Sequence, residues 1–149
     1  VHEVLPIMEA QKTPAHLMCT ASIAGLRAGM AINPPYFCSK HAAVSVAESV
    51  KAEVESSGSD IGVSVFCPMY VATDASDPFY NSEEYLTARE AFHKNIATGM
   101  PLKKIGKRLF KAIEDNQMYI VTHTQTIPYI ESRHRAIEED AKKELELQL

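Results

Sequence analysis

Apolar and polar residues alternate along this 149-residue chain in patterns that separate strands from helices. The runs at 16–20 and 61–67 are short and almost wholly apolar, which is typical of strands buried on both faces. Between them, residues 35–57 carry small and apolar side chains nearly all round a helical repeat, with proline at the head and Gly58 just past the end. This order predicts a βαβ unit with two parallel strands.

More elements are expected after this unit. The polar, aromatic-bearing stretch 74–98 has helical spacing in its second part. The remaining segments are a helix at 102–116, a third strand at 118–121 and a charged helix from 127 to the end. Apolar residues at the opening of the chain also have helical spacing, so we expect further sequence before Val1.

Composition and charge exclude several classes of protein. Hydrophobic residues make up 46% of the chain and charged residues 23%, which is the composition of a globular domain and not of a disordered segment. The formal net charge is −4 and no strongly basic face stands out, so we expect no nucleic-acid partner. No apolar run approaches the ~20 residues of a membrane-spanning helix, so we expect no membrane association.

The cysteines and histidines predict neither a disulfide framework nor a metal site. Cys19, Cys38 and Cys67 lie far apart among apolar neighbours, which predicts buried free thiols and a cytoplasmic protein. The histidines have no partner at metal-ligand spacing, so we expect no metal. His123, at the end of the third strand, is interpreted as a capping or interface residue.

Three side chains, Ser22, Tyr36 and Lys40, are the candidates for catalysis. Tyr36 and Lys40 are four residues apart near the start of the long helix and therefore project from the same face. A phenol that exchanges protons near neutral pH needs help, and an ammonium group one turn away favours the phenolate. Ser22 follows the first strand directly, at the edge where the carboxyl ends of parallel strands meet the N-termini of helices. This geometry can bring both hydroxyls to one substrate oxygen.

The surroundings of these residues resemble the short-chain dehydrogenase/reductase family. A tyrosine and a lysine at this spacing occur in many helices without any function, so the context decides. Here the order and spacing of three segments match the family, over roughly residues 1–122. The segments are 20–26 (TASIAGL), 36–43 (YFCSKHAA) and 66–73 (FCPMYVAT).

The resemblance implies a role for each catalytic residue. Ser22 corresponds to the serine that orients and polarises the substrate carbonyl, and Ile23 lies beside it at the substrate. Tyr36 corresponds to the general acid/base. Lys40 corresponds to the lysine that favours the tyrosine's phenolate and bonds the nicotinamide ribose, so Tyr36 and Lys40 also contact the cofactor. The implied cofactor is NAD or NADP, which carries the hydride itself.

The segment after the second strand is implied to hold the nicotinamide carboxamide. Its cofactor-binding residues are Pro68, Met69, Val71 and Thr73, while Tyr70 is implied to lie at the substrate. Met69 departs from the family, which usually has glycine after this proline. A side chain at this position narrows the room for the cofactor.

The family's nucleotide-binding half is not found in this sequence. No G-x-x-x-G-x-G turn occurs that would bind the pyrophosphate at a helix N-terminus, and no Asn-Ala-Gly stretch occurs either. The family's catalytic asparagine and the residue that selects NAD or NADP would fall upstream of Val1; neither Asn33 nor Asn81 stands at the asparagine's position. We therefore expect the 149-residue chain to be inactive by itself.

The resemblance implies an α/β fold: the C-terminal half of a Rossmann-type, doubly wound parallel sheet with flanking helices, as one domain over 1–149. Within it, 83–116 is interpreted as a substrate lid and the following helix, and 127–149 as a C-terminal helix. The expected function is NAD(P)-dependent interconversion of a small alcohol and ketone, in a homodimer or homotetramer formed through the 36–57 helix. The alternative is a truncated, non-catalytic module that uses this helix for oligomerisation or partner binding.

Overall fold

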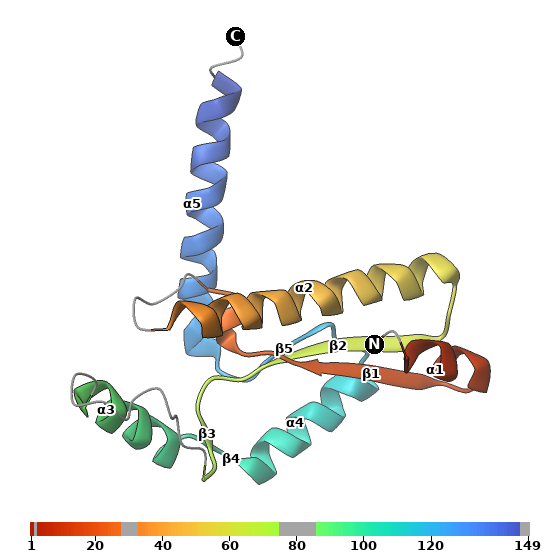
Figure 1. The fold of residues 1–149 in the computed structure, drawn as a ribbon, viewed down its shortest axis with the longest axis horizontal. Helices are drawn as coiled ribbons and strands as arrows, with labels where there is room; N and C mark the ends of the chain where they lie inside the picture. The colour runs from red at the N-terminus through yellow and green to blue at the C-terminus, as the bar shows by residue number, and fades with distance from the viewer. Residues whose placement is uncertain (2, 28–32, 75–85, 147–149) are drawn as a thin grey trace.

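A sheet of three parallel strands forms the centre of the molecule (Figure 1). The computed structural model describes residues 1, 3–27, 33–74 and 86–146. The strands are β1 (Ala15–Thr20), β2 (Ile61–Cys67) and β5 (Tyr119–Val121), and they lie in the order β1-β2-β5. The three strands expected from the sequence are therefore present and parallel.

Five α-helices accompany the strands in the part of the chain that the structure describes. They are α1 (Leu5–Gln11), α2 (Pro34–Ser57), α3 (Leu86–Ala97), α4 (Leu102–Glu114) and α5 (Ile127–Glu146). The sequence pattern gives no sign of the short elements, which are the 3-10 turns η1 (Ile23–Gly25) and η4 (Thr124–Thr126) and a parallel ladder of β3 (Val71–Ala72) with β4 (Met100–Pro101). The lid residues 83–85 lie outside the described residues.

The helix α2 begins and ends at residues suited to those positions. The Asn33 side-chain oxygen accepts a hydrogen bond from the Tyr36 N–H at 3.2 Å, which caps the helix. Two prolines occupy its first positions, where a helix makes no use of backbone N–H groups. Gly58 ends the helix with a φ of 68° and donates its N–H back to Val54 and Glu55.

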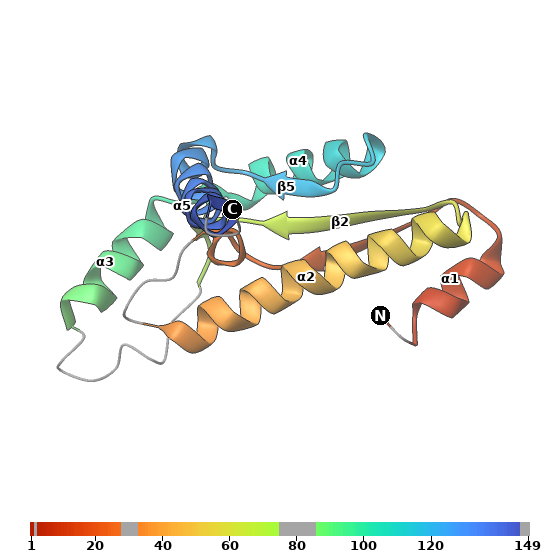
Figure 2. The same ribbon diagram turned by 90° about the horizontal axis from the view of Figure 1, so that it is seen from above.

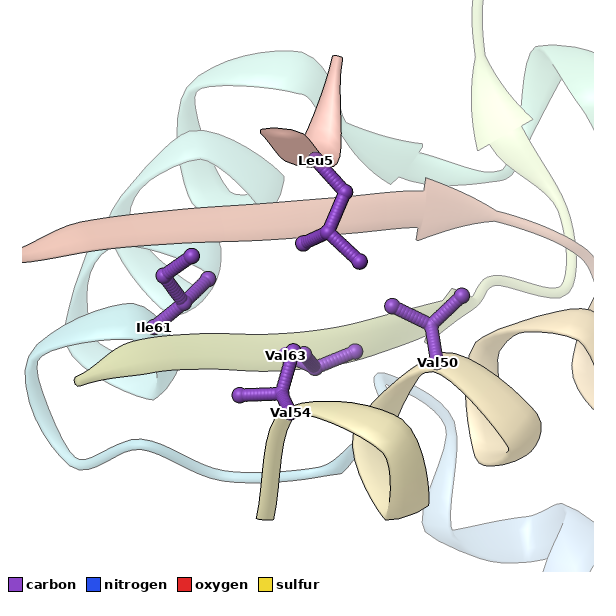
Figure 3. Packing of buried hydrophobic residues seen from close by; sticks show 5 residues of the cluster. All are labelled: Leu5, Val50, Val54, Ile61 and Val63. Carbon is purple, nitrogen blue, oxygen red and sulfur yellow. The ribbon is translucent and has the colours of Figure 1, made fainter. Parts of the chain in front are cut away.

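Helices cover both faces of β2, so the sheet is doubly wound. On one face Ile61 and Val63 pack with Leu5 of α1 and with Val50 and Val54 of α2 (Figure 3). On the opposite face β2 packs against α4, through contacts of Phe66 with Ile105 and Ala112. Because both faces are covered, β2 is buried along nearly its whole length, as its continuous apolar run predicts.

The strand β1 lies at one edge of the sheet. Four of its six residues are half-buried and two, Met18 and Thr20, are exposed, in contrast to the residues of β2, which are nearly all buried. The prediction of buried cysteines is correct only in part. Cys67 of β2 is buried, Cys19 of β1 is half-buried, and Cys38 of α2 is exposed because it lies on the outward side of the helix.

The C-terminal helix α5 stands away from the rest of the molecule. It rises from the sheet in Figure 1 and is seen end-on in Figure 2. The element against which it packs most is η4, the turn that directly precedes it. Among the helices described, none is long and apolar enough to cross a bilayer.

Candidate active site

Ser22 is held at the carboxyl end of β1 by contacts on both sides. Its side-chain oxygen accepts a hydrogen bond from the Ala24 N–H at 3.2 Å and so caps the turn η1. The same hydroxyl donates to the carbonyl oxygen of Pro68, which follows β2, at 3.4 Å. The residue is buried. Ser22 therefore joins the ends of two neighbouring strands, at the edge where parallel sheets bind ligands.

Gly25 brings the turn η1 into close contact with α2. A Cβ atom at this position would lie 2.4 Å from the Lys40 carbonyl oxygen and 2.8 Å from the Val44 Cγ2 atom. Any side chain would therefore push the turn away from the helix. The close approach places Ser22 beside the first turns of α2.

Tyr36 and Lys40 lie in those first turns. The Lys40 Nζ atom lies 5.6 Å from the centre of the Tyr36 ring, so the ammonium group is close to the phenol, as their spacing predicts. Tyr36 is 42% exposed, which leaves its hydroxyl accessible to a substrate. Among the described residues, no hydrogen bond joins the side chains of Ser22 and Tyr36.

The segment after β2 is fixed through its backbone. The Pro68 carbonyl oxygen accepts from the Ile23 N–H at 2.9 Å, and the Tyr70 carbonyl oxygen accepts from the Met100 N–H at 3.0 Å. Val71 then continues into the ladder β3–β4. The segment predicted to hold the nicotinamide is thus attached to both η1 and β4.

His123 provides a third attachment for this segment. The Met69 N–H donates to the His123 Nδ1 atom at 3.4 Å, and the Thr122 hydroxyl lies 2.8 Å from the same atom. Because a backbone N–H can only donate, Nδ1 acts as the acceptor and carries no proton. Burial lowers the pKa of His123, the nearby Tyr70 backbone raises it, and the positive charge of Arg108 lowers it.

The structure does not support the capping alternative for His123, and the interface alternative stays a prediction. The residue stands at the N-cap of η4 but makes no side-chain cap hydrogen bond, and its ring contacts the segment after β2 instead. Arg108 of α4 donates to the Thr122 carbonyl oxygen and so fixes the same end of β5. A histidine at the carboxyl end of a strand, close to a predicted site, was the available signal for this role.

The other predicted site residues differ in exposure. Ile23 is buried, Met69 and Val71 are half-buried, and Thr73 is exposed and donates to the Val71 carbonyl oxygen at 3.4 Å. Tyr70 packs edge-on against Phe92 of α3, with ring centres 6.3 Å apart. The roles of these residues toward a cofactor or substrate stay predictions.

Two further kinds of chemistry find no support here. Burial raises the pKa of the Cys67 thiol to about 11, with smaller effects from a backbone hydrogen bond of Ser22, which lowers it, from Glu48, which raises it, and from Lys40, which lowers it. A thiol with so high a pKa carries little thiolate near neutral pH and is a poor nucleophile. Among the residues described, no group of three or more histidine, cysteine or carboxylate side chains gathers at a metal-binding distance.

Comparison with known proteins finds several relatives. A family model for short chain dehydrogenases matches residues 1–84. A CLA biosynthesis dehydrogenase/reductase from Lactiplantibacillus plantarum is 36% identical, with 97% of this chain and 55% of that protein aligned. A C alpha-dehydrogenase from Sphingobium sp. is 25% identical, with 89% of this chain and 46% of that protein aligned. The chain thus spans about half the length of these curated relatives.

A solved structure supports the same relationship. A short chain dehydrogenase/reductase from Burkholderia phymatum, crystallised in complex with NAD, matches with a TM-score of 0.78 and 28% identity. The match covers 94% of this chain and 54% of that one. The parallel sheet, its two helical layers and the family model over more than half of the sequence agree, so this chain belongs to the short chain dehydrogenase family.

Proposed function

We propose that this chain forms the catalytic half of an NAD(P)-dependent oxidoreductase that interconverts an alcohol and a ketone. The observation that carries the proposal is the placement of three side chains at one edge of the sheet. Tyr36 and Lys40 lie in the first turns of α2, and the close packing of η1 brings Ser22 beside them. The family relationship supports oxidoreductase chemistry at this edge.

Tyr36 acts as the general acid/base. In the reducing direction its exposed hydroxyl gives a proton to the substrate oxygen, and in the oxidising direction it takes that proton back. The Lys40 ammonium group, 5.6 Å from the ring centre, offsets the negative charge that the phenol acquires. General acid–base catalysis of this kind contributes about 10²- to 10⁴-fold to a rate.

Ser22 orients the substrate oxygen. Its hydrogen bond to the Pro68 carbonyl oxygen is long, at 3.4 Å, and therefore weak. The hydroxyl can turn from this carbonyl toward a substrate oxygen at little cost. Its second contact, from the Ala24 N–H, keeps the oxygen in place while the proton turns.

The residues fit the nicotinamide end of NAD or NADP. The Tyr36 hydroxyl and the Lys40 ammonium group are donors for the ribose, and the fixed segment 68–73 would hold the carboxamide. When bound, this cofactor supplies the hydride. The related Burkholderia structure, crystallised with NAD, supports this choice. The turn that binds the pyrophosphate would lie in the half of the family fold that this chain does not span.

The proposal extends to substrate and assembly. The edge-on pair of Tyr70 and Phe92 at the carboxyl end of the sheet favours a mostly apolar alcohol or ketone. The outward face of α2 carries Val46, which is 47% exposed, and this face would join two copies of the protein.

The test removes the Tyr36 hydroxyl from the polypeptide that the whole gene encodes, called here the whole-gene polypeptide. Tyr36→Phe should lower kcat at least about 100-fold while NADH binding, followed by nicotinamide fluorescence, persists. The matched control is Tyr119→Phe, because Tyr119 is also 42% exposed but lies on β5. This control should retain turnover within about threefold.

The outcomes separate the two functions considered. If Tyr36→Phe kept turnover within a few-fold, the catalytic assignment would be wrong. If the unaltered whole-gene polypeptide failed to bind either dinucleotide, the non-catalytic module would be favoured. The 149-residue chain should bind the dinucleotide far more weakly than the whole-gene polypeptide, because the sequence holds no glycine-rich turn.

A further inference from the structure

We propose that α5 is a docking helix for a second copy of this chain and pairs antiparallel with its counterpart. The helix has 20 residues and is about 30 Å long. Beyond its first turns it extends away from the sheet and from α2 (Figure 1). A solitary helix of this length gains little stability in water without a packed face. A partner along α5 would supply that face.

One side of α5 carries an apolar stripe. Its members recur every three or four residues, which is the spacing of the seam between two paired helices. Ile137 is 54% exposed and Leu145 is 67% exposed, so the stripe is open to solvent at the middle and end of the helix. The stripe consists of Ile127, Ile130, Ile137, Ala141 and Leu145, and the polar residue His134 interrupts it between Ile130 and Ile137.

The charges on α5 favour an antiparallel partner. Residues 127–136 contain one carboxylate and two arginines, for a net charge of +1. Residues 137–146 contain five carboxylates and two lysines, for a net charge of −3. This acidic half lies at the negative end of the helix dipole, where carboxylates are least favourable. An antiparallel copy brings its basic half beside the acidic half, whereas a parallel copy would place the two acidic halves together.

One register satisfies both the charges and the stripe. In this register the twofold axis passes between residues 136 and 137, so Ile137 lies near Ile137 of the second copy at the centre of the pair. Ile130 then lies near Leu145 of the second copy, offset by one or two residues along the helix. The same register aligns opposite charges on both flanks of the stripe. These pairs are Arg133 with Asp140, Arg135 with Glu138, and Glu131 with Lys142 of the second copy. Asp140 is already bound within its own helix by Lys143 at 2.7 Å.

A second copy fits this surface better than additional strands of the sheet. The helix follows β5, which lies on the opposite side of β2 from the edge strand β1. Strands added beside β1 would extend the sheet on the side away from β5, and the segment after β1 contacts α5 at its first turn, where Arg27 lies 4.6 Å over the Tyr129 ring. Moreover, the complementary pairs come from the two halves of one helix, and such a self-complementary surface forms a twofold dimer. The helix pair is small for a specific interface, so we expect reversible association.

The first test measures the direction of pairing by cysteine cross-linking. It uses the whole-gene polypeptide with Cys38→Ser, because Cys38 is the exposed cysteine among the three. Antiparallel pairing predicts that Ile137→Cys forms an intermolecular disulfide and that Leu145→Cys does not, since two copies of residue 145 lie at opposite ends of the pair. Cross-linking at both positions, at residue 145 alone, or at neither position would overturn the proposal.

The second test measures the dissociation constant for pairing through α5 by sedimentation equilibrium, in a Val46→Glu background that weakens association through the outward face of α2. Arg133→Glu should raise the constant at least about tenfold, because it places like charges opposite Asp140 in both halves of the dimer. The double variant with Asp140→Arg as well should return it to within about threefold of the unaltered value. Circular dichroism checks that each variant remains helical. A dissociation constant that is the same in both variants as in the Val46→Glu protein would overturn the proposal.

Discussion

Replacing Gly25 with alanine tests how the site is assembled. The added methyl carbon would start 2.4 Å from the Lys40 carbonyl oxygen and 2.8 Å from the Val44 Cγ2 atom. Lys40 contributes backbone here, which cannot rotate out of the way as a side chain could. The turn η1 must therefore move away from α2, and it takes Ser22 with it.

The size of the effect follows from the distances. Ordinary contact begins near 3.4 Å, so the turn must shift by about 1 Å to relieve the contact with the Lys40 oxygen. Overpacking of this kind costs about 1–3 kcal/mol in the free energy of unfolding. A shift of about 1 Å in a catalytic group lowers a rate about 100-fold.

Both quantities can be measured on the whole-gene polypeptide, by urea unfolding and by kcat/KM for dinucleotide-dependent turnover. The control is Gly106→Ala in α4, since a Cβ atom at Gly106 has nothing within 4 Å. Alanine in a helix interior is better than glycine by about 0.5–1 kcal/mol, so this variant should be slightly more stable.

The two variants make the same chemical change and should shift stability in opposite directions. If Gly25→Ala were as stable as the unaltered protein and turned over within about threefold of it, the close contact of η1 with α2 would not position Ser22. Loss of stability without loss of turnover would show that the contact stabilises the fold but does not position Ser22 for catalysis.

Three more outcomes follow from the structure. Burial lowers the pKa values of His16 and His123 from 6.5, so near that pH the folded protein binds fewer protons than the unfolded chain. The free energy of unfolding, measured in urea, should therefore fall as the pH drops below 6.5. A free energy of unfolding that rises on acidification would contradict this. The Tyr119 hydroxyl donates to a Glu48 carboxylate oxygen at 2.7 Å, and this bond raises the pKa of Tyr119 to about 12. Its contribution should be present below pH 10 and lost between pH 10 and 12, and Tyr119→Phe should remove that step from the pH profile of unfolding. Gly58→Ala should cost about 1 kcal/mol in thermal or urea unfolding, because φ is 68° there, and an asparagine should cost less.

The βαβ unit could be predicted closely because its signals are local. The bounds of β2 agree with the apolar run 61–67, which ends at a proline. The helix α2 begins one residue earlier than expected, at Pro34, because Asn33 provides the cap. An asparagine directly before two prolines is itself a sign of a helix start, so the sequence does hold a signal for this cap.

Contacts between distant parts of the chain could not be predicted in the same way. His123 contacts Met69 across 54 residues, and no periodicity connects them. In the part of the chain that the structure describes, the two-residue strands β3 and β4 pair only with each other, although Val71 and its partner Met100 lie 29 residues apart in the sequence. The exposure of Cys38 also depends on three dimensions, since its apolar neighbours in sequence lie on other sides of the helix.

The candidate site contains one feature that local sequence predicts and one that depends on a contact between distant parts of the chain. The pairing of Tyr36 with Lys40 follows from helical spacing alone. The position of Ser22 depends on the approach of η1 to α2, and the glycine that permits this approach is recognisable only once the two backbones are seen together.

The place of β1 at the edge of the sheet has a consequence for how the protein can be divided. The residues proposed for proton transfer and for nicotinamide binding lie in the part of the chain from β1 to Thr73, directly after β3. A polypeptide that supplies further strands would form backbone hydrogen bonds with the free edge of β1, and this boundary would not divide α2 or the site. A boundary of this kind suits fragment complementation, in which two separately produced pieces reassemble without a covalent link. One piece would then carry the residues for proton transfer, and the other would carry the residues that bind the phosphates of the dinucleotide.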